Sequence, residues 1–251
     1  MKKRVVLFDF HNTLVTCDAW LELEIRTLAR EVLRKLDEDG QLQPRSGDFE
    51  RADKLFRTLR LQVHESGREV SAVEGAMSVL RDLGYDVAEP EVGRAVAELE
   101  QALLPQVEMV QGADRTLTLL RDAGYRLGVV SSAGYPLFVE PALEELGLRA
   151  YFSAIVTTTG ERLYKSNPEI YGRAAHLLDA SPQEAVHVGD HVRFDVQSAR
   201  AAGLSAIWVV AQARRTAELR REAWDDDLSR AGADAVVESL DEVFGAVQSL
   251  G

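Results

Sequence analysis

Short apolar runs alternate with helical patterns, and this alternation limits the possible folds more than any other feature. The runs are rich in β-branched residues and have no alternating polar face, as is typical of strands covered on both faces. They fall at residues 4–9, 125–131, 154–158, 185–190 and 205–210, with 235–237 as a candidate sixth. Helical patterns at 114–123, 168–178 and 194–202 lie between them. Strands and helices in alternation predict a parallel sheet with crossover helices.

The long interval after the first predicted strand differs from the rest, because it contains helical patterns and no predicted strand. Between residues 16 and 111, four apolar stripes recur at the spacing of an amphipathic helix. They comprise Leu21, Ile25, Leu28, Val32 and Leu36; Ala52, Leu55, Phe56, Leu59 and Val63; Val73, Met77 and Leu80; and Val92, Val96, Leu99 and Leu103. The sequence therefore predicts an α/β fold: a Rossmann-like parallel sheet core over residues 1–15 and 110–251, with an all-helical domain inserted over residues 16–109. The segment after Val15 and the region of Pro105 would be the two linkers.

Composition excludes several classes of protein. Of 251 residues, 46% are hydrophobic and 28% charged, which is typical of a globular chain, and the formal net charge is −12. An acidic chain without a long basic run is unsuited to nucleic acid or anionic membranes. A single cysteine, Cys17, precludes an internal disulfide and favours a reducing compartment. No signal peptide or membrane span is expected, so we predict a cytoplasmic protein. The polar run 212–230, which includes Asp225, Asp226 and Asp227, is expected to be a solvated helix or loop rather than a metal site.

Polar side chains with useful chemistry follow four of the predicted strands. Asp9, Ser131 and Asp190 come at strand ends, and Lys165 lies in the loop after another strand. The carboxyl ends of parallel strands meet at one edge, where open sheets bind ligands. One carboxylate could act as a nucleophile, the lysine and serine could bind phosphate, and the second carboxylate could share a divalent cation with the first.

These residues stand in four motifs that resemble those of the haloacid dehalogenase superfamily. Residues 9–14, Asp-Phe-His-Asn-Thr-Leu, are similar to its first motif, Asp-x-Asp-x-Thr. Residues 129–132, Val-Val-Ser-Ser, resemble the second, although Ser132 stands where the family usually has asparagine. Residues 165–171 begin with the lysine of the third motif, and residues 188–195 carry the Gly-Asp and later Asp of the fourth. The resemblance implies that the helical insert is a cap over the active site, and that the protein is a phosphatase of a small phosphorylated metabolite.

The resemblance also implies a role for each motif residue. Asp9 would attack phosphorus and form an aspartyl phosphate. Mg²⁺ would be held by Asp9, the main-chain carbonyl of His11 and Asp190. Lys165 and Ser131, with Ser132, would bind the phosphate oxygens. Two further residues would support the site from behind: Asp195 would orient Lys165 or a metal-bound water, and Thr13 would hold the turn after the first strand.

His11 is the main departure from the family pattern, since most phosphatases of the superfamily have aspartate there as the general acid and base. An unperturbed histidine pKa of about 6.5 suits both roles near neutral pH. Two alternatives therefore stay open. One is a catalytically impaired protein that still binds metal and phosphate; the other is a dehalogenase-like hydrolase, against which the intact Asp190 argues.

The remaining candidates are less specific. His187 is expected to be a packed strand residue, and His64 and His176 to lie at the surface. His191 could reach the site, where it would favour a softer metal than Mg²⁺. Cap residues that could face the substrate are Trp20, Arg45, Arg57 and His64. The sequence leaves the substrate and the oligomeric state open.

Overall fold

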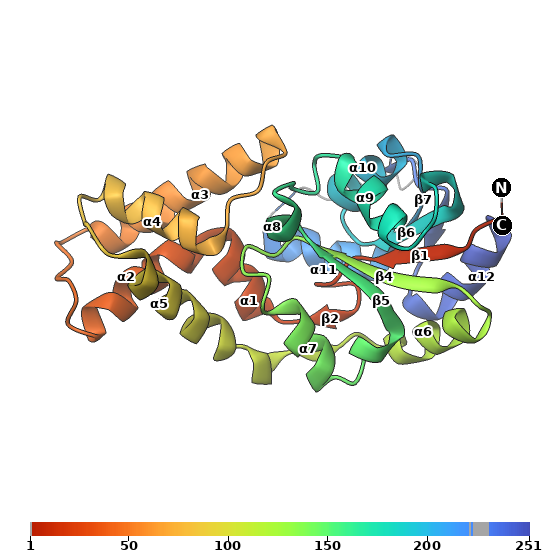
Figure 1. The fold of residues 1–251 in the computed structure, drawn as a ribbon, viewed down its shortest axis with the longest axis horizontal. Helices are drawn as coiled ribbons and strands as arrows, with labels where there is room; N and C mark the ends of the chain where they lie inside the picture. Colours follow the sequence, from red (N-terminus) through yellow and green to blue (C-terminus); the bar gives the residue numbers. More distant parts are fainter. Residues whose placement is uncertain (1, 221, 223–230) are drawn as a thin grey trace.

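A six-stranded parallel sheet forms the centre of the larger lobe in the computed structural model, which describes residues 2–220, 222 and 231–251 (Figure 1). The strand order is β5-β4-β1-β6-β7-β8, which places the first strand in the middle. The strands are β1 (Val5–Phe8), β4 (Arg126–Ser131), β5 (Phe152–Thr157), β6 (Ala185–Gly189), β7 (Ser205–Val209) and β8 (Ala235–Val237). All six predicted strands are therefore present, with ends within two residues of the predicted ones.

Helices cover both faces of this sheet, which explains the continuous apolar runs. Val6 and Phe8 pack on one face, in a core that includes α6 (Ala113–Asp122), α7 (Val139–Glu145) and α12 (Val243–Ser249). Val5 and Leu7 point to the other face, against α9 (Glu169–Leu177), α10 (Ser198–Ala201) and α11 (Val210–Arg220). Successive side chains of a strand alternate between faces, so both sets must be apolar.

Three details of the sheet lobe differ from the sequence prediction. The helix predicted over 194–202 is a π-helical segment, Val192–Gln197, followed by the short α10. The run predicted as solvated begins with α11, whose Ala213 and Thr216 are buried, because this helix packs beside the carboxyl edge of the sheet. The acidic triplet 225–227 lies outside the described residues. The helix α7 was not predicted.

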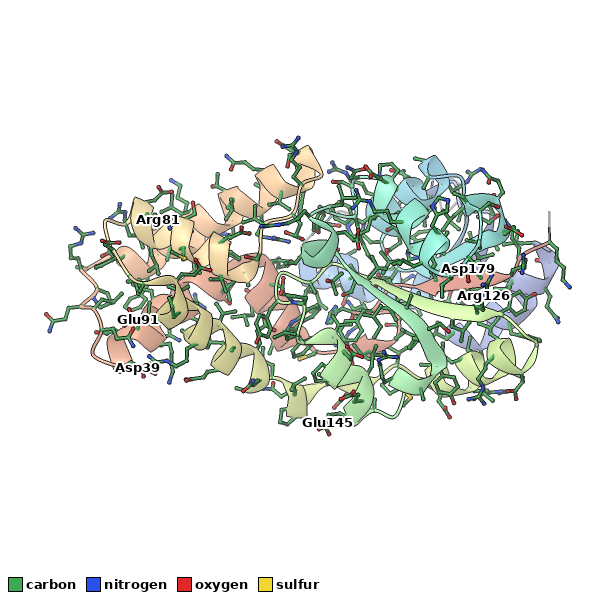
Figure 2. The ribbon with its side chains drawn as sticks, in the orientation of Figure 1. Asp39, Arg81, Glu91, Arg126, Glu145 and Asp179 are labelled. Atoms are coloured by element: carbon green, nitrogen blue, oxygen red, sulfur yellow. The ribbon has the colours of Figure 1, made fainter. Side chains whose placement is uncertain are left out.

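A second lobe consists of helices only and lies beyond one end of the sheet (Figure 1). Its helices are α1 (Asp18–Glu22), α2 (Leu28–Glu38), α3 (Asp48–Ser66), α4 (Ala72–Asp82) and α5 (Glu89–Gln101), with a π-helical turn, Leu23–Thr27, between α1 and α2. The predicted stripes supply a separate apolar core, which includes Leu28, Val32, Phe56, Leu80 and Val96. Charged side chains such as Asp39, Arg81 and Glu91 decorate its surface, while Arg126 and Asp179 pair at 3.2 Å on the sheet lobe (Figure 2). None of the helices among the described residues is long and apolar enough to cross a membrane.

The two linkers between the lobes pair with each other. The strand β2 (Val15–Thr16) runs antiparallel to β3 (Glu108–Met109), and the Val110 amide donates to the Leu14 carbonyl at 2.9 Å. The prediction of no strand in this interval was therefore wrong, because two-residue strands leave no recognisable pattern. The segment that leads into the helical lobe and the segment that leads out of it are therefore joined in one two-stranded ribbon.

The helical lobe also contacts the sheet lobe beside the predicted phosphate motifs. The Tyr164 amide donates to the Gly67 carbonyl at 3.0 Å, and the Glu69 amide to the Arg162 carbonyl at 3.3 Å. The Ala72 amide donates to the Gly134 carbonyl at 2.8 Å. The first two bonds hold the loop between α3 and α4 against the segment that leads to Lys165, and the third holds the start of α4 against the loop after β4.

Candidate active site

One pocket at the carboxyl edge of the sheet brings together the predicted site residues. Asp9 follows the central strand β1, Ser131 ends β4 and Asp190 follows β6, so adjacent strands supply three of them. The described residues that line the pocket include seven of those predicted from sequence: Asp9, His11, Ser131, Ser132, Lys165, Asp190 and Asp195. Thr13, the eighth, lies behind Asp9 and donates its hydroxyl to Asp9 Oδ2 at 3.1 Å.

Lys165 is a buried cation held between two carboxylates. Its Nζ donates to Asp9 Oδ1 and, at 2.6 Å, to Asp195 Oδ1. Burial lowers the pKa of Lys165, but the charges of Asp195 and Asp9 outweigh burial and raise the pKa above its usual value. The lysine is therefore fully charged at neutral pH and directed at the predicted nucleophile.

Asp195 uses both oxygens to support its neighbours. In addition to Lys165, Oδ1 lies 3.1 Å from His187 Nε2, and Oδ2 accepts the His191 amide at 3.0 Å. Burial raises its pKa, yet Lys165 and His187 hold that pKa below the usual range. Only glycine fits at Gly189, since a Cβ there would lie 2.5 Å from the Asp195 side chain. This contact explains the Gly-Asp pair of the fourth motif.

Asp190 is fixed by a chain of hydrogen bonds from α11. The Thr216 hydroxyl donates to Asp190 Oδ2, and the Asn12 side-chain amide donates to the Thr216 oxygen at 2.7 Å. Asn12 adopts a left-handed conformation with φ 61°, which asparagine tolerates well. Because Thr216 Oγ1 accepts from Asn12, its proton is directed at the carboxylate.

The acidic residues of the pocket fit a divalent cation. Oxygens of Asp9, Asp190 and Asp195 lie within 4.8 Å of one another, and Lys165 is the only buried lysine beside them among the described residues. Burial, reinforced by the charges of Asp9 and Asp195, raises the pKa of Asp190 well above its usual value. Among the described residues Asp195 makes three such contacts, with Lys165, His187 and His191, whereas Asp9 accepts two hydrogen bonds and Asp190 one, so Asp9 and Asp190 keep more lone pairs for a cation. Hard carboxylate oxygens are the ligands that Mg²⁺ prefers.

His11 is directed toward the linker rather than toward a carboxylate. Its Nε2 lies 3.0 Å from the Cys17 carbonyl oxygen and 3.2 Å from the Cys17 amide nitrogen, and its ring lies 5.5 Å from that of Trp20. Burial lowers the pKa of His11 to about 4, with a smaller opposing effect from the Cys17 bond. The imidazole is therefore neutral at pH 7, the form that accepts a proton.

The other histidines divide between confirmed and corrected predictions. His187 is fully buried in β6, as predicted, and His176 is exposed. His64 is not a surface residue, because its ring stacks on Tyr164 at 4.6 Å between the two lobes. His191 Nδ1 accepts the Phe194 amide at 3.4 Å, and its Nε2 lies 3.2 Å from Glu222. Both ring nitrogens of His191 therefore have partners other than Asp9, Asp190 and Asp195, which disfavours the softer-metal alternative.

The wall of the pocket opposite the sheet comes from the helical lobe. Trp20 lines it, as the sequence suggested, together with Leu21, Glu24, Ile25 and Arg60. Arg45 and Arg57 do not line it. Arg45 pairs with Asp48 at 3.2 Å near the far end of the lobe, and Arg57 is exposed on α3. Sequence alone could not orient these side chains, because a helical stripe shows which face is buried but not which end faces the other lobe.

Glu24 links this wall to the loop after the second motif. Its carboxylate accepts the Gly134 amide at 3.0 Å and the Tyr135 amide at 3.4 Å. Burial raises the pKa of Glu24 to about 7, opposed by Arg60 and by the Gly134 bond. Glu24 lies in the first π-helical segment and Asp195 in the second, so each irregular helix carries a pocket residue.

Glu100 is a buried carboxyl group that contacts Trp20, and its burial predicts a pH-dependent stability that can be tested. The Trp20 indole donates to Glu100 Oε2 at 2.8 Å, and burial raises the pKa of Glu100 to about 9. The folded state then retains a proton that the unfolded state loses above about pH 4.5, so stability falls as pH rises from there to about 9. We expect Glu100→Gln, which keeps an acceptor for Trp20, to raise the Tm at pH 8 by at least about 2–4 °C and to have little effect at pH 4.5. Thermal unfolding at pH 4.5 and pH 8 measures this difference, and Glu65→Gln, at an exposed position, is the control. An equal rise in the Tm of Glu100→Gln at both pH values would contradict the prediction.

Three comparisons with known proteins agree with this geometry. A family model described as a haloacid dehalogenase-like hydrolase matches residues 3–203. The glyceraldehyde 3-phosphate phosphatase of Methanopyrus kandleri is 29% identical over 240 residues, which cover 96% of this chain and 97% of the relative. The human haloacid dehalogenase-like hydrolase domain-containing protein 3 is 35% identical over 103 residues, or 41% of this chain and 40% of the relative.

Solved structures resemble the whole chain. A HAD phosphatase from Thermococcus onnurineus superposes with a TM-score of 0.61 at 23% identity, covering 98% of both chains, and supports the fold alone. A 2-haloacid dehalogenase from Pseudomonas syringae gives a TM-score of 0.65 at 25% identity over 99% of both chains. The fold is thus shared by proteins named for two different reactions, so residues in the pocket must distinguish them.

Proposed function

Because the chain belongs to the haloacid dehalogenase-like hydrolase family, we propose that it is a Mg²⁺-dependent phosphatase that hydrolyses a small phosphoric monoester through an aspartyl phosphate on Asp9. The observation that carries this proposal is the joint placement of Asp9, Ser131, Lys165 and Asp190 around one pocket. A lone carboxylate could act in many reactions, whereas a buried carboxylate pair with a lysine and hydroxyls beside it suits a phosphoryl group.

The first chemical step follows from the contacts of Asp9. One carboxylate oxygen attacks phosphorus, the ester P–O bond breaks, and the leaving oxygen takes a proton from the imidazolium form of His11 and departs as the alcohol. Lys165 Nζ, already at Asp9, compensates charge on the phosphoryl oxygens, and Ser131 and Ser132 supply hydroxyl donors from the next strand. Mg²⁺ held by Asp9, Asp190 and the His11 carbonyl would offset the repulsion between the nucleophile and a phosphate dianion.

Proton transfer falls to His11. The neutral imidazole can take a proton from the water that attacks the aspartyl phosphate, which returns Asp9 and releases inorganic phosphate. For Nε2 to take this proton, it must first leave Cys17, the residue that follows β2 in the linker. Movement of the linker and proton transfer are therefore coupled through one hydrogen bond.

The helical lobe acts as the cap in this proposal. Residues 16–109 would form the cap domain, and residues 1–15 and 110–251 the hydrolase core. Trp20, Leu21 and Ile25 present apolar surface to the pocket and would exclude bulk water during phosphoryl transfer. We place the enzyme in the cytoplasm, on the strength of its single cysteine.

Glyceraldehyde 3-phosphate is the first ester to assay, because three relatives that are matched over 80–97% of their length are named as phosphatases of this compound. We expect inorganic phosphate release with Mg²⁺, its loss with a chelator, and better recovery with Mg²⁺ than with Ca²⁺, whose looser shell misplaces the phosphoryl group. Full activity in excess chelator would favour the dehalogenase-like alternative. Tight Mg²⁺ and phosphate binding without turnover of any ester would favour the impaired one.

Thr216 provides an independent test of the proposed cation site. Removing its hydroxyl frees the Asp190 carboxylate to rotate, so Thr216→Val is expected to weaken Mg²⁺ binding by about 10–100-fold. Thr216→Ser retains the hydroxyl and should bind normally. The matched control is Thr116→Val, since the buried Thr116 hydroxyl donates to the Leu240 carbonyl at 2.8 Å, outside the pocket. Calorimetric titration with Mg²⁺ measures all three; equal affinity in Thr216→Val and wild type would remove Thr216 from the site.

A further inference from the structure

Arg60 is a buried guanidinium on the cap side of the pocket that the mechanism above does not use. It lies on α3, and its side chain is 7% exposed. Nη1 donates to Glu69 Oε1 at 2.7 Å, and the guanidinium lies 5.5 Å from the centre of the Tyr164 ring. These contacts fix the side chain in one orientation, with part of it lining the pocket.

Glu69 is fully occupied by this support. Besides Arg60, it accepts the Val70 amide at 3.0 Å on Oε1 and the Thr158 hydroxyl at 2.6 Å on Oε2. Arg60 is less well satisfied, because its Nε is buried and has no hydrogen-bond partner in the described part of the chain. Nη1 is therefore the one guanidinium nitrogen of Arg60 that makes a hydrogen bond among the described residues. A buried cation with N–H groups that lack an acceptor is costly, which makes a ligand oxygen in the pocket a natural partner of this guanidinium.

Charge decides which kind of oxygen fits. The charged side chains that line the pocket among the described residues are the cations Arg60, Lys165 and Arg220 and the carboxylates Asp9, Glu24, Asp190 and Asp195, and Glu69 adds another carboxylate behind Arg60. A bound divalent cation would bring the net charge of these side chains close to zero, and a phosphate dianion would make the net charge of the site negative again. A second anionic group on the substrate would add to that excess in a buried site.

We propose that Arg60 is a specificity-determining residue whose guanidinium binds an uncharged oxygen, a hydroxyl or carbonyl, on the leaving group of the phosphate ester. This assignment rests on the proposed function and narrows its substrate class to phosphates of small polyols or hydroxyaldehydes. Trp20, Leu21 and Ile25 enclose the same wall, so the polar contact would be made in a largely apolar setting. Esters that carry a carboxylate are disfavoured.

Three esters of equal chain length test the proposal: propyl phosphate, glycerol 3-phosphate and 3-phosphoglycerate. Beyond the phosphate, propyl phosphate presents no oxygen to the cap, glycerol 3-phosphate presents uncharged hydroxyl oxygens, and 3-phosphoglycerate presents a carboxylate. We expect kcat/KM for glycerol 3-phosphate to exceed that for propyl phosphate by about 10–100-fold, the effect of one hydrogen bond to a charged group. The value for 3-phosphoglycerate should be lower than that for glycerol 3-phosphate. Arg60→Met should reduce the glycerol-to-propyl ratio to near one.

Ratios within one variant do not depend on how much of it is folded, which matters because Arg60→Met leaves Glu69 buried and unpaired. Arg60→Met combined with Glu69→Gln removes both charges and should give the same ratio. Arg57→Met, an exposed arginine on the same helix, should keep the wild-type ratio. A wild-type ratio in both Arg60 variants, or a preference for 3-phosphoglycerate in the wild type, would overturn the proposal.

Binding separates this proposal from the proposed function. Calorimetric titration of the Asp9→Asn protein with each of the three esters, in the presence of Mg²⁺, gives their dissociation constants without turnover. The ratios of these constants, with and without Arg60→Met, correspond to the kinetic ratios above. If the wild-type protein releases no phosphate from any ester, but the binding ratio of the esters still depends on Arg60 as expected, the phosphatase proposal is refuted and the Arg60 subsite is supported. If the wild type releases phosphate from an aryl ester, but no ratio depends on Arg60, the phosphatase proposal is supported and the Arg60 subsite is refuted.

Discussion

Asp9→Asn is expected to reduce phosphate release by about 10³-fold or more, because an amide oxygen cannot take the place of the attacking carboxylate. The fold should survive, since asparagine has the same shape, its one oxygen can still accept from Lys165, and its amide group can donate to the Thr13 hydroxyl oxygen. Phosphate release from several esters, with circular dichroism to verify folding, measures both effects. Asp122→Asn, at an exposed position, is the control. Turnover above a few per cent of wild type in Asp9→Asn would show that another group is the nucleophile.

His11→Ala should reduce turnover by about 10²–10⁴-fold for esters with poor leaving groups, the usual contribution of a general acid or base. The loss should be much smaller for an aryl phosphate, whose leaving group needs little protonation. His11→Asp should retain or raise activity, since aspartate is the residue that most phosphatases of the family use. An unchanged rate in His11→Ala for every ester would leave only the main-chain carbonyl with a role.

The pH dependence of wild type separates the two proton transfers. With the pKa of His11 lowered to about 4, the imidazolium that protonates a leaving group becomes scarcer as pH rises above that value. Turnover of a poor-leaving-group ester should therefore fall with rising pH. For an aryl ester, hydrolysis of the aspartyl phosphate needs the neutral imidazole and should be insensitive to pH above about 4. Parallel pH profiles for the two esters would contradict this assignment.

The arrangement of the sheet and the motif residues could be predicted because both depend on local pattern. Apolar runs marked the strands, and the residue after each run marked the carboxyl edge, where Asp9, Ser131 and Asp190 do meet. Family resemblance supplied the connection between motifs that are far apart in sequence. The predicted support of Lys165 by Asp195 also agrees with their 2.6 Å contact.

The residues that were missed come from regions where pattern carries no spatial information. Thr216 lies in a run of arginines and small residues that resembles a solvated helix, and only packing beside β7 buries it. Arg60 interrupts an apolar stripe on α3, and an arginine among apolar positions could have been recognised as a candidate. The direction of His11 toward Cys17 depends on the β2–β3 ribbon, whose strands are too short to predict.

The central position of β1 has a consequence for synthesis of the chain. Val5–Phe8 must pair with β4 on one side and β6 on the other, and Val5 aligns with Ala185 in the latter. At about 5–20 residues per second, the first strand leaves the ribosome on the order of 10 s before its second neighbour is made. Both edges of these four apolar residues are unpaired until β4 is made, and the edge that pairs with β6 stays unpaired throughout the interval, a state prone to aggregation. Expression at lower temperature or with chaperones should therefore improve the yield of folded protein more than any change on the surface of the helical lobe.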